Sequence, residues 1–204
     1  KPGKHKACIT RGGELDNVVR GIQAAETVGL TPVKINCVVI RGLNDGDVVE
    51  LARRTRVEGW NVRFIEVMPL GEGALWSGEG YVPTPEIRQR IEGELGPLEP
   101  ATIHGNGPAR YWRLPGAAGT IGFISARSEH FCGTCNRLRL TSNGRLMPCL
   151  MSDMQIDLRT PLRAGANDEK LRELFLRGVA MKPARHHLAE HLAPANRLMS
   201  RVGG

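Results

Sequence analysis

The sequence predicts an α/β fold with a parallel sheet of the kind found in (β/α) barrels, followed by a small α+β domain. Three observations lead to this prediction: a strand–helix–strand pattern in the first third, short strands and turns after it, and a cysteine-rich stretch from Ser128 to Leu150. Because strands joined through a helix by short connections form a βαβ unit, these strands should be parallel. In barrels of this kind, functional residues lie at the carboxyl ends of the strands.

The first elements follow from hydrophobic periodicity. Apolar residues at helical spacing from position 15 to 28 predict a helix that ends at Gly29. A β-branched run, "TPVKINCVVI" at 31–40, predicts a buried strand. A second helix is expected in "NDGDVVELARRTRVEG" at 44–59, and a second buried strand in "NVRFIEVMPL" at 61–70. The first helix should follow a further strand, for which this sequence holds no candidate.

The pattern of predicted elements changes after Pro69. We expect a loop, a helix near 86–95, short strands near 109–114 and 120–125, a hairpin in the cysteine-rich stretch, and a last helix over about 167–181. This gives two predicted domains: 1–127, with the parallel strands and a connecting segment, and 128–204, with the cysteine-rich stretch.

Composition narrows the function classes. The net charge of +7 suits an anionic partner, but aromatic residues make up only 4% of the chain. That is too few for a base-stacking platform, so a phosphorylated small molecule fits better than nucleic acid. No apolar run approaches the roughly 20 residues of a membrane span, and five unpaired-looking cysteines without a secretory signal favour a cytoplasmic metal site.

The cysteine-rich stretch holds the candidate metal ligands. Cys132 and Cys135 form a C-x-x-C pair, and Cys149 follows an Asn-Gly turn whose predicted register sets it opposite Leu138, with a bend at Pro148. Three readings stay open on spacing alone: unligated thiols, a zinc ribbon with a fourth ligand, or an iron–sulfur cluster held by three thiolates with one open iron.

Cationic side chains accompany these sites. Arg137 and Arg139 lie at i and i+2 on a predicted strand, so they share a face and suit a phosphate or an anionic base edge. Lys34 and Asn36 are likewise polar at i and i+2 in an apolar strand, which favours a barrel interior that meets an anion. Glu66 shares the face of Met68, but no role follows for it.

Taken together, these motifs resemble the GTP 3′,8-cyclase family, the radical SAM enzymes of molybdenum-cofactor biosynthesis. "FCGTCNRLRLTSNGRLMPCL" is similar to the C-terminal cluster motif of that family, and "VKINCVVIRGLND" and "VRFIEVMPLGEG" are similar to its later barrel segments. "KPARHHL" and the terminal Gly203-Gly204 resemble its tail. The likeness extends over essentially the whole chain.

The resemblance implies specific roles. It makes Cys132, Cys135 and Cys149 the ligands of a [4Fe–4S] cluster whose open iron takes the purine of GTP, and it makes this a lyase that converts GTP to 3′,8-cyclo-7,8-dihydro-GTP. GTP would be bound by Lys34, Arg137, Leu138 and Arg139, and Met68 would line the S-adenosylmethionine site. No residue of this chain is expected to be catalytic.

One feature of the family is missing from the sequence. Radical SAM enzymes carry an N-terminal C-x3-C-x2-C segment for a second [4Fe–4S] cluster, and no such motif occurs here. We therefore expect an incomplete radical-SAM barrel that is inactive alone, with the missing N-terminal segment or a complementary chain as partner and a homodimer left open. A zinc-ribbon nucleic-acid module, or another radical SAM maturase with an auxiliary cluster, is the alternative.

Overall fold

The computed structural model describes residues 14–105, 107–186, 188 and 194. Residues group into two compact units along the chain. Unit 1 takes the chain up to Val67 and again from Trp76 to Glu129, and unit 2 takes Met68–Leu75 and the chain from His130 onward. The short excursion at Met68–Leu75 was not foreseen from the sequence, and the functional boundary expected at residue 128 stays a prediction.

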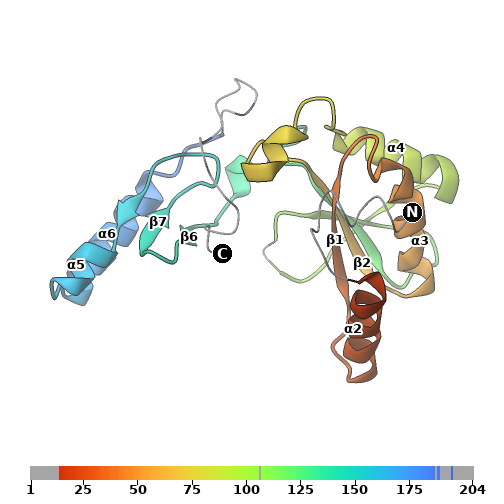
Figure 1. Cartoon of the computed structure of the whole chain (residues 1–204), viewed down its shortest axis with the longest axis horizontal. Coiled ribbons are helices and arrows are strands. Elements are labelled where there is room, and N and C mark those ends of the chain that lie inside the picture. The colour runs from red at the N-terminus through yellow and green to blue at the C-terminus, as the bar shows by residue number, and fades with distance from the viewer. Residues whose placement is uncertain (1–13, 106, 187, 189–193, 195–204) are drawn as a thin grey trace. The chain divides into compact units, whose positions relative to one another are not determined.

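Unit 1 is built on a five-stranded mixed sheet, which confirms the α/β class (Figure 1). Its strands are β1 (Lys34–Val39), β2 (Asn61–Glu66), β3 (Glu99–Ala101), β4 (Arg110–Arg113) and β5 (Thr120–Ile124), in the spatial order β1-β2-β5-β4-β3. The pair β1–β2 is parallel, as the βαβ pattern predicts. β2 and β5 are also parallel, whereas β4 runs antiparallel to both β3 and β5. The outer strands β1 and β3 do not meet, so the sheet does not close into a barrel.

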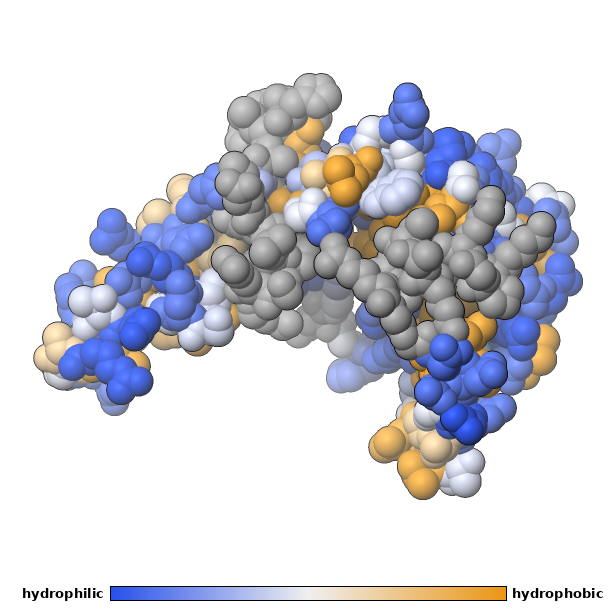
Figure 2. Space-filling view, in the orientation of Figure 1, coloured by the Kyte–Doolittle hydropathy of each residue, from blue (hydrophilic) through white to orange (hydrophobic). Residues whose placement is uncertain are grey.

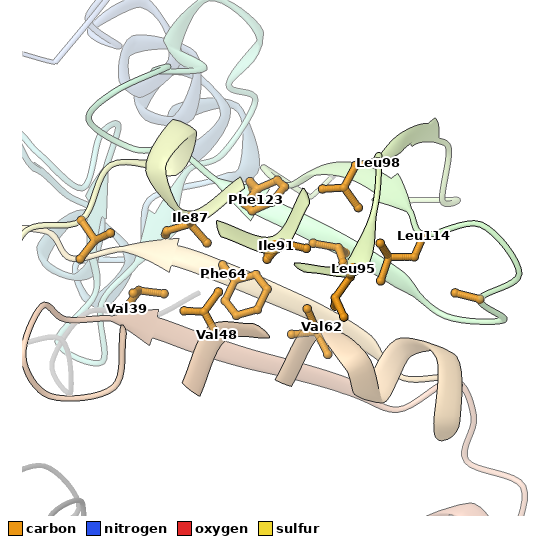
Figure 3. Close-up of a cluster of buried hydrophobic side chains, with 14 residues drawn as sticks. Val39, Val48, Val62, Phe64, Ile87, Ile91, Leu95, Leu98, Leu114 and Phe123 are labelled. Carbon is orange, nitrogen blue, oxygen red and sulfur yellow. The ribbon is translucent and has the colours of Figure 1, made fainter. Parts of the chain in front are cut away.

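The helices of unit 1 follow the predicted ranges closely. They are α2 (Leu15–Thr27), α3 (Val48–Val57), which is preceded by a 3-10 turn, and α4 (Thr84–Leu95). Helices α3 and α4 pack against each other and against β2, so both cover the same face of the sheet (Figure 1). The core lies between them and the sheet. Phe64 is fully buried there, with its ring centroid 6.1 Å from that of Phe123 (Figure 3).

The opposite face of β1 is open. Along this strand Lys34, Asn36 and Val38 are exposed, while the alternate residues face the core. The expectation of a strand buried on both faces was therefore wrong for β1, because no described element covers its second face. The second predicted strand, β2, is largely buried as expected.

Helix α2 also keeps its apolar side chains in contact with water. None of its residues is buried, and Leu15, Val18 and Val19 have exposed fractions of 53%, 58% and 40%. The loop beyond it adds Val28 and Leu30, which are also exposed. Figure 2 shows apolar side chains gathered at the free end of this helix. An apolar helix stripe of this kind normally packs against another element.

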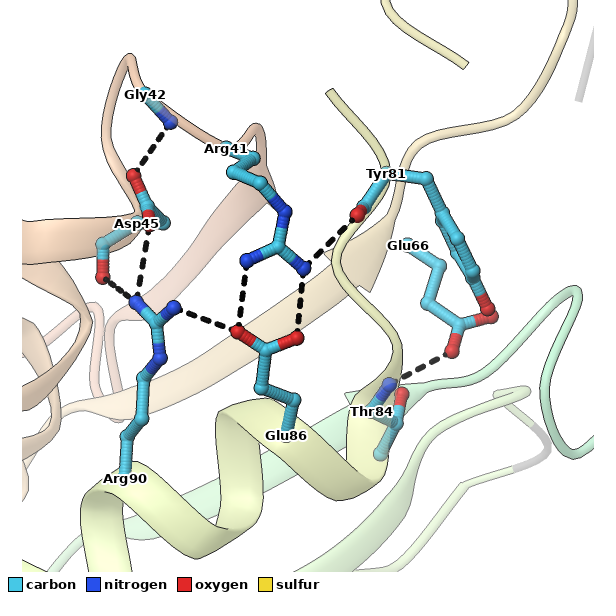
Figure 4. Close-up of polar contacts among 8 residues, drawn as sticks. All are labelled: Arg41, Gly42, Asp45, Glu66, Tyr81, Thr84, Glu86 and Arg90. Atoms are coloured by element: carbon cyan, nitrogen blue, oxygen red, sulfur yellow. Dashed lines mark hydrogen bonds and ion pairs between the residues drawn. The ribbon is translucent and has the colours of Figure 1, made fainter. Parts of the chain in front are cut away.

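An ion-pair network ties the loop after β1 to helix α4 (Figure 4). The guanidinium of Arg41 donates to both carboxylate oxygens of Glu86, at 2.9 and 2.6 Å, and Arg90 bridges Glu86 and Asp45 at 2.6 and 3.0 Å. The N–H of Gly42 donates to Asp45. The network fixes the chain at the carboxyl end of β1, where barrel-type folds carry functional residues.

Unit 2 contains the predicted cysteine hairpin and the last helix. Its sheet has the order β6-β7-β8, with β6 at Arg139–Leu140, β7 at Arg145–Met147 and β8 at Ile156–Asp157. Helices α5 (Arg159–Arg163) and α6 (Asp168–Ala180) follow the sheet along the chain. A small core of Leu146, Ile156, Leu158 and Leu174 joins α6 to the hairpin. On α6, Leu174 is buried, whereas Phe175 and Val179 are exposed.

Candidate functional site

The C-x-x-C pair folds into one tight turn of unit 2. A 3-10 turn spans Cys132–Thr134, and the N–H of Cys135 donates to the carbonyl of Cys132 at 3.1 Å. Both cysteines are half-buried, and neither forms a disulfide bond. The turn brings the two thiols onto the same short stretch of backbone, as a metal-binding C-x-x-C requires.

The hairpin then carries the chain back toward this turn, with a register one residue away from the predicted one. Arg139 pairs with Met147, so the same register extended to Cys149 sets it opposite Arg137 and not Leu138. The cause is the loop, because Gly144 adopts a positive φ of 77° and adds a residue to the turn. β7 stops at Met147, and Pro148 follows it, as expected for a residue that lacks the ladder N–H.

Hydrogen-bond donors and positive charges lie near the sulfur atoms of Cys135 and Cys149. A guanidinium nitrogen of Arg137 lies 3.7 Å from the sulfur of Cys135, and the N–H of Met151 donates to the sulfur of Cys149 at 3.4 Å. Burial raises the pKa of Cys135, but the backbone N–H of Arg137 and the charges of Lys182 and Arg137 outweigh it, so the pKa lies below its usual value. The turn therefore favours a thiolate at Cys135.

Arg139 is a half-buried cation of the same loop. Burial and the charge of Arg137 lower its pKa, while the charges of Cys135 and Cys149 act in the opposite direction. An arginine keeps its charge under such conditions. The structure thus brings both predicted arginines near the predicted cysteine ligands, and the guanidinium of Arg137 also stacks on Phe131 with 4.9 Å to the ring centroid.

The donor set fits an iron–sulfur cluster in its chemistry. Thiolates are the ligands of such clusters, and hydrogen bonds to sulfur together with nearby charge set their potentials. In the described part of the chain, however, no three His, Cys, Asp or Glu side chains already converge as a metal site. The assignment of Cys132, Cys135 and Cys149 as ligands therefore stays a prediction.

The remaining predicted residues are divided between the two units. Lys34 begins β1 in unit 1, where its side chain is exposed. Met68 lies two residues beyond the end of β2 and belongs to unit 2, where it is half-buried. Leu138 packs partly buried against the core of unit 2, so its side chain supports the hairpin. Gly203 and Gly204, which the resemblance connects with the site, lie outside the described residues.

A buried carboxylate, for which we predicted no role, lies at the end of β2. Glu66 is fully buried and accepts hydrogen bonds from the backbone N–H groups of Thr84, Arg127 and Ser128, at 2.8, 2.7 and 3.0 Å (Figure 4 shows the bond to Thr84). The Ser128 hydroxyl also donates to it. These bonds lower the pKa of Glu66 although burial alone would raise it.

Tyr81 and Arg127 also belong to the surroundings of Glu66. Burial, followed by the charge of Glu66, raises the pKa of Tyr81 to about 12. The guanidinium of Arg127 lies over the Tyr81 ring, 3.9 Å from its centroid. Glu66 immediately precedes Val67 and is bonded to Arg127 and Ser128, so it fixes unit 1 close to two of the points where the chain passes into unit 2.

Comparison with known proteins adds the family to this geometry. The model of the Molybdenum Cofactor Synthesis C family matches residues 60–188. The chain belongs to this family. The Molybdenum Cofactor Synthesis C match covers β2, the cysteine turn, the hairpin and α6.

Curated proteins similar to this chain include several GTP 3′,8-cyclases. GTP 3′,8-cyclases of Pelotomaculum thermopropionicum and Moorella thermoacetica are each 49% identical over 197 residues, which is 96% of this chain and 60% of theirs. That of Heliobacterium modesticaldum is 49% identical over 206 residues, 100% of this chain and 63% of the relative. The chain thus spans about three fifths of the length of these relatives. Among the described residues, none of the helices has the length and apolar character to cross a membrane.

Proposed function

We propose that this chain supplies the substrate-binding part of a GTP 3′,8-cyclase, a lyase of molybdenum-cofactor biosynthesis that converts GTP to 3′,8-cyclo-7,8-dihydro-GTP. The observation that carries the proposal is the loop of unit 2, which carries Cys132, Cys135 and Cys149 and in which the cations Arg137, Arg139 and Lys182 act on the thiols of Cys135 or Cys149. A site of that composition suits an anionic ligand beside a thiolate-bound metal centre. The names of the relatives support the same reaction.

In the proposed arrangement, Cys132, Cys135 and Cys149 hold a [4Fe–4S] cluster. When bound, this cluster supplies an open iron position for the purine of GTP. Arg137 and Arg139 present fork-shaped donors that bind an anion with fixed geometry, which a point charge would not do. The backbone next to Leu138 contributes a further contact to the substrate, while its side chain stays in the core.

The strands of unit 1 have a supporting part in this proposal. Parallel strands β1, β2 and β5 are assigned to an incomplete radical-SAM barrel, with the cluster- and GTP-binding domain beginning at Ser128. The exposed ammonium of Lys34 binds the phosphates, and Met68 lines the S-adenosylmethionine site. S-adenosylmethionine and a second [4Fe–4S] cluster, held by a segment of the full-length enzyme with the C-x3-C-x2-C motif, would supply the radical that takes a ribose hydrogen before C3′ attacks C8. The protein contributes binding and orientation.

The test is metal analysis after anaerobic reconstitution with iron and sulfide. We expect about four irons and four sulfides per chain, lost in Cys149→Ala and retained in Cys37→Ala, whose thiol lies in unit 1. Titration with GTP should then show binding that weakens in Arg139→Ala. One tightly bound zinc per chain without sulfide would refute the proposal and favour the zinc-ribbon module. An intact cluster that does not bind GTP would favour another radical SAM maturase.

A further inference from the structure

A lysine that follows helix α6 reaches into the cysteine loop. The ammonium of Lys182 donates to the backbone carbonyl of Arg137 at 2.7 Å and to that of Pro148 at 2.9 Å. Its positive charge also helps to lower the pKa of the Cys135 thiol. Two of the three N–H donors of the ammonium group are thus used by backbone carbonyls of the cysteine loop.

The two carbonyls belong to opposite arms of the hairpin, just where strand pairing ends. β6 begins at Arg139 and β7 ends at Met147, so the carbonyls of Arg137 and Pro148 lie immediately outside the ladder. Pro148 has no N–H with which to continue the pairing. Lys182 therefore joins the arms at the position where the backbone cannot, between the residues that lead to Cys135 and Cys149.

Helix packing brings this lysine to the loop. α6 contacts β7, and its Leu174 belongs to the core of unit 2. Gly178 allows the close approach, because a Cβ there would lie 2.5 Å from a methyl carbon of Leu146. The helix ends at Ala180 with Met181 as its C-cap, and Lys182 is the next residue. The last turn of α6 is thus fixed against the same hairpin that carries the cysteines.

We infer that Lys182 is a positioning residue of the candidate site: its ammonium closes the cysteine loop and holds a positive charge beside the sulfur ligands. The inference rests on the proposed cluster. A nearby cation stabilises the more negative, reduced state of a cluster, and donors to sulfur and neighbouring backbone hold the ligands in place. Lys182 supplies the charge and the bonds to the neighbouring backbone, and it does so from just beyond α6, far in the sequence from the C-x-x-C motif.

The test compares Lys182→Met with Lys182→Arg in the reconstituted chain, and with Lys170→Met as a matched control. Lys170 lies on the same helix, but its side chain is 51% exposed and pairs with Glu173. We expect Lys182→Met to lose iron to a chelator about 10-fold faster than the unmodified chain. Its cluster should also have a lower midpoint potential in a redox titration followed by electron paramagnetic resonance. Lys182→Arg should restore the potential, and Lys170→Met should change neither value.

A measurement without the cluster tests the loop closure itself. In the iron-free chain, Lys182→Met should speed amide hydrogen exchange in β6 and β7 relative to Lys170→Met. If Lys182→Met fails to fold, Lys182→Gln keeps a hydrogen-bond donor, removes the charge, and should still lower the potential. An unchanged potential and unchanged iron retention in the folded variants would overturn the inference and leave the proposed function standing. Failure of the unmodified chain to take up iron and sulfide would overturn both.

Discussion

Replacing Glu66 by glutamine should destabilise unit 1 far more than the same change at a surface carboxylate. The Glu66 carboxylate accepts three backbone N–H bonds and one hydroxyl bond while fully buried. A glutamine amide can accept on one oxygen only. With its NH2 group toward Thr84, the Ser128 hydroxyl can turn to accept, but the Thr84 N–H loses its partner.

The magnitude follows from these contacts. A buried N–H left without an acceptor costs about 1–3 kcal/mol, and each bond that changes from a charged to a neutral acceptor loses about 1 kcal/mol. With the bonds from Arg127 and Ser128 weakened in this way, we expect Glu66→Gln to lower the free energy of unfolding by roughly 3–5 kcal/mol. The control is Glu86→Gln, because Glu86 is a partly exposed member of the ion-pair network, where the loss should be below about 1 kcal/mol.

The assay is urea unfolding followed by tryptophan fluorescence. Trp60, Trp76 and Trp112 are the three tryptophans of the sequence, and all lie in unit 1, so the signal reports on the unit that contains Glu66. The folded-state pKa of Glu66 is lowered, so its stabilisation is complete above the unfolded value of about 4.3 and is lost as the pH falls through the folded pKa. The difference between the unmodified chain and Glu66→Gln should therefore shrink in acid. A loss no larger than that of Glu86→Gln at pH 7 would refute the reasoning.

Three further outcomes are expected. Gly178→Val should overpack the contact with Leu146 and destabilise unit 2 by about 1–3 kcal/mol, seen as faster amide exchange in α6; unchanged exchange would contradict the close approach. Burial raises the pKa of Cys37 to about 11, whereas the pKa of Cys135 is lowered. Iodoacetamide at pH 8 should therefore modify Cys135 before Cys37 in the iron-free chain, as followed by mass spectrometry. Equal rates of modification at these two cysteines would contradict the prediction. Arg139→Lys should weaken GTP binding about 10-fold by calorimetry without loss of iron, since an ammonium lacks the planar fork; an unaltered affinity would remove Arg139 from the site.

Much of the fold was predictable because its signals are local. The helical spacing before Gly29 and the β-branched runs at β1 and β2 gave elements and parallel pairing that the structure confirms. The exposure of Lys34 and Asn36 was not predictable, because a strand's own pattern cannot say what covers its second face. The hairpin register depended on the conformation of Gly144, which shifted it by one residue.

The long-range contacts of Glu66 and Lys182 could not be predicted for a different reason. Spacing and resemblance predict the cysteines and Arg137 as site residues, and these lie close together in the sequence. Glu66 receives its donors from residues 61 and 62 positions away, and Lys182 reaches the carbonyl of Arg137 across 45 positions. A buried carboxylate and a tail lysine carry no local pattern for such partners, so only the fold reveals them.

The strand order of unit 1 has a consequence for synthesis on the ribosome. β2 lies between β1 and β5, and its partner residues Asn61 and Thr120 are 59 positions apart. At a translation rate of about 5–20 residues per second, β2 emerges roughly 3–12 seconds before β5. During that interval one edge of β2 lacks its neighbour, and α4 must fold over a sheet that is not yet complete. The nascent chain is therefore open to wrong pairing in this window, and slower translation between β2 and β5 would lengthen it.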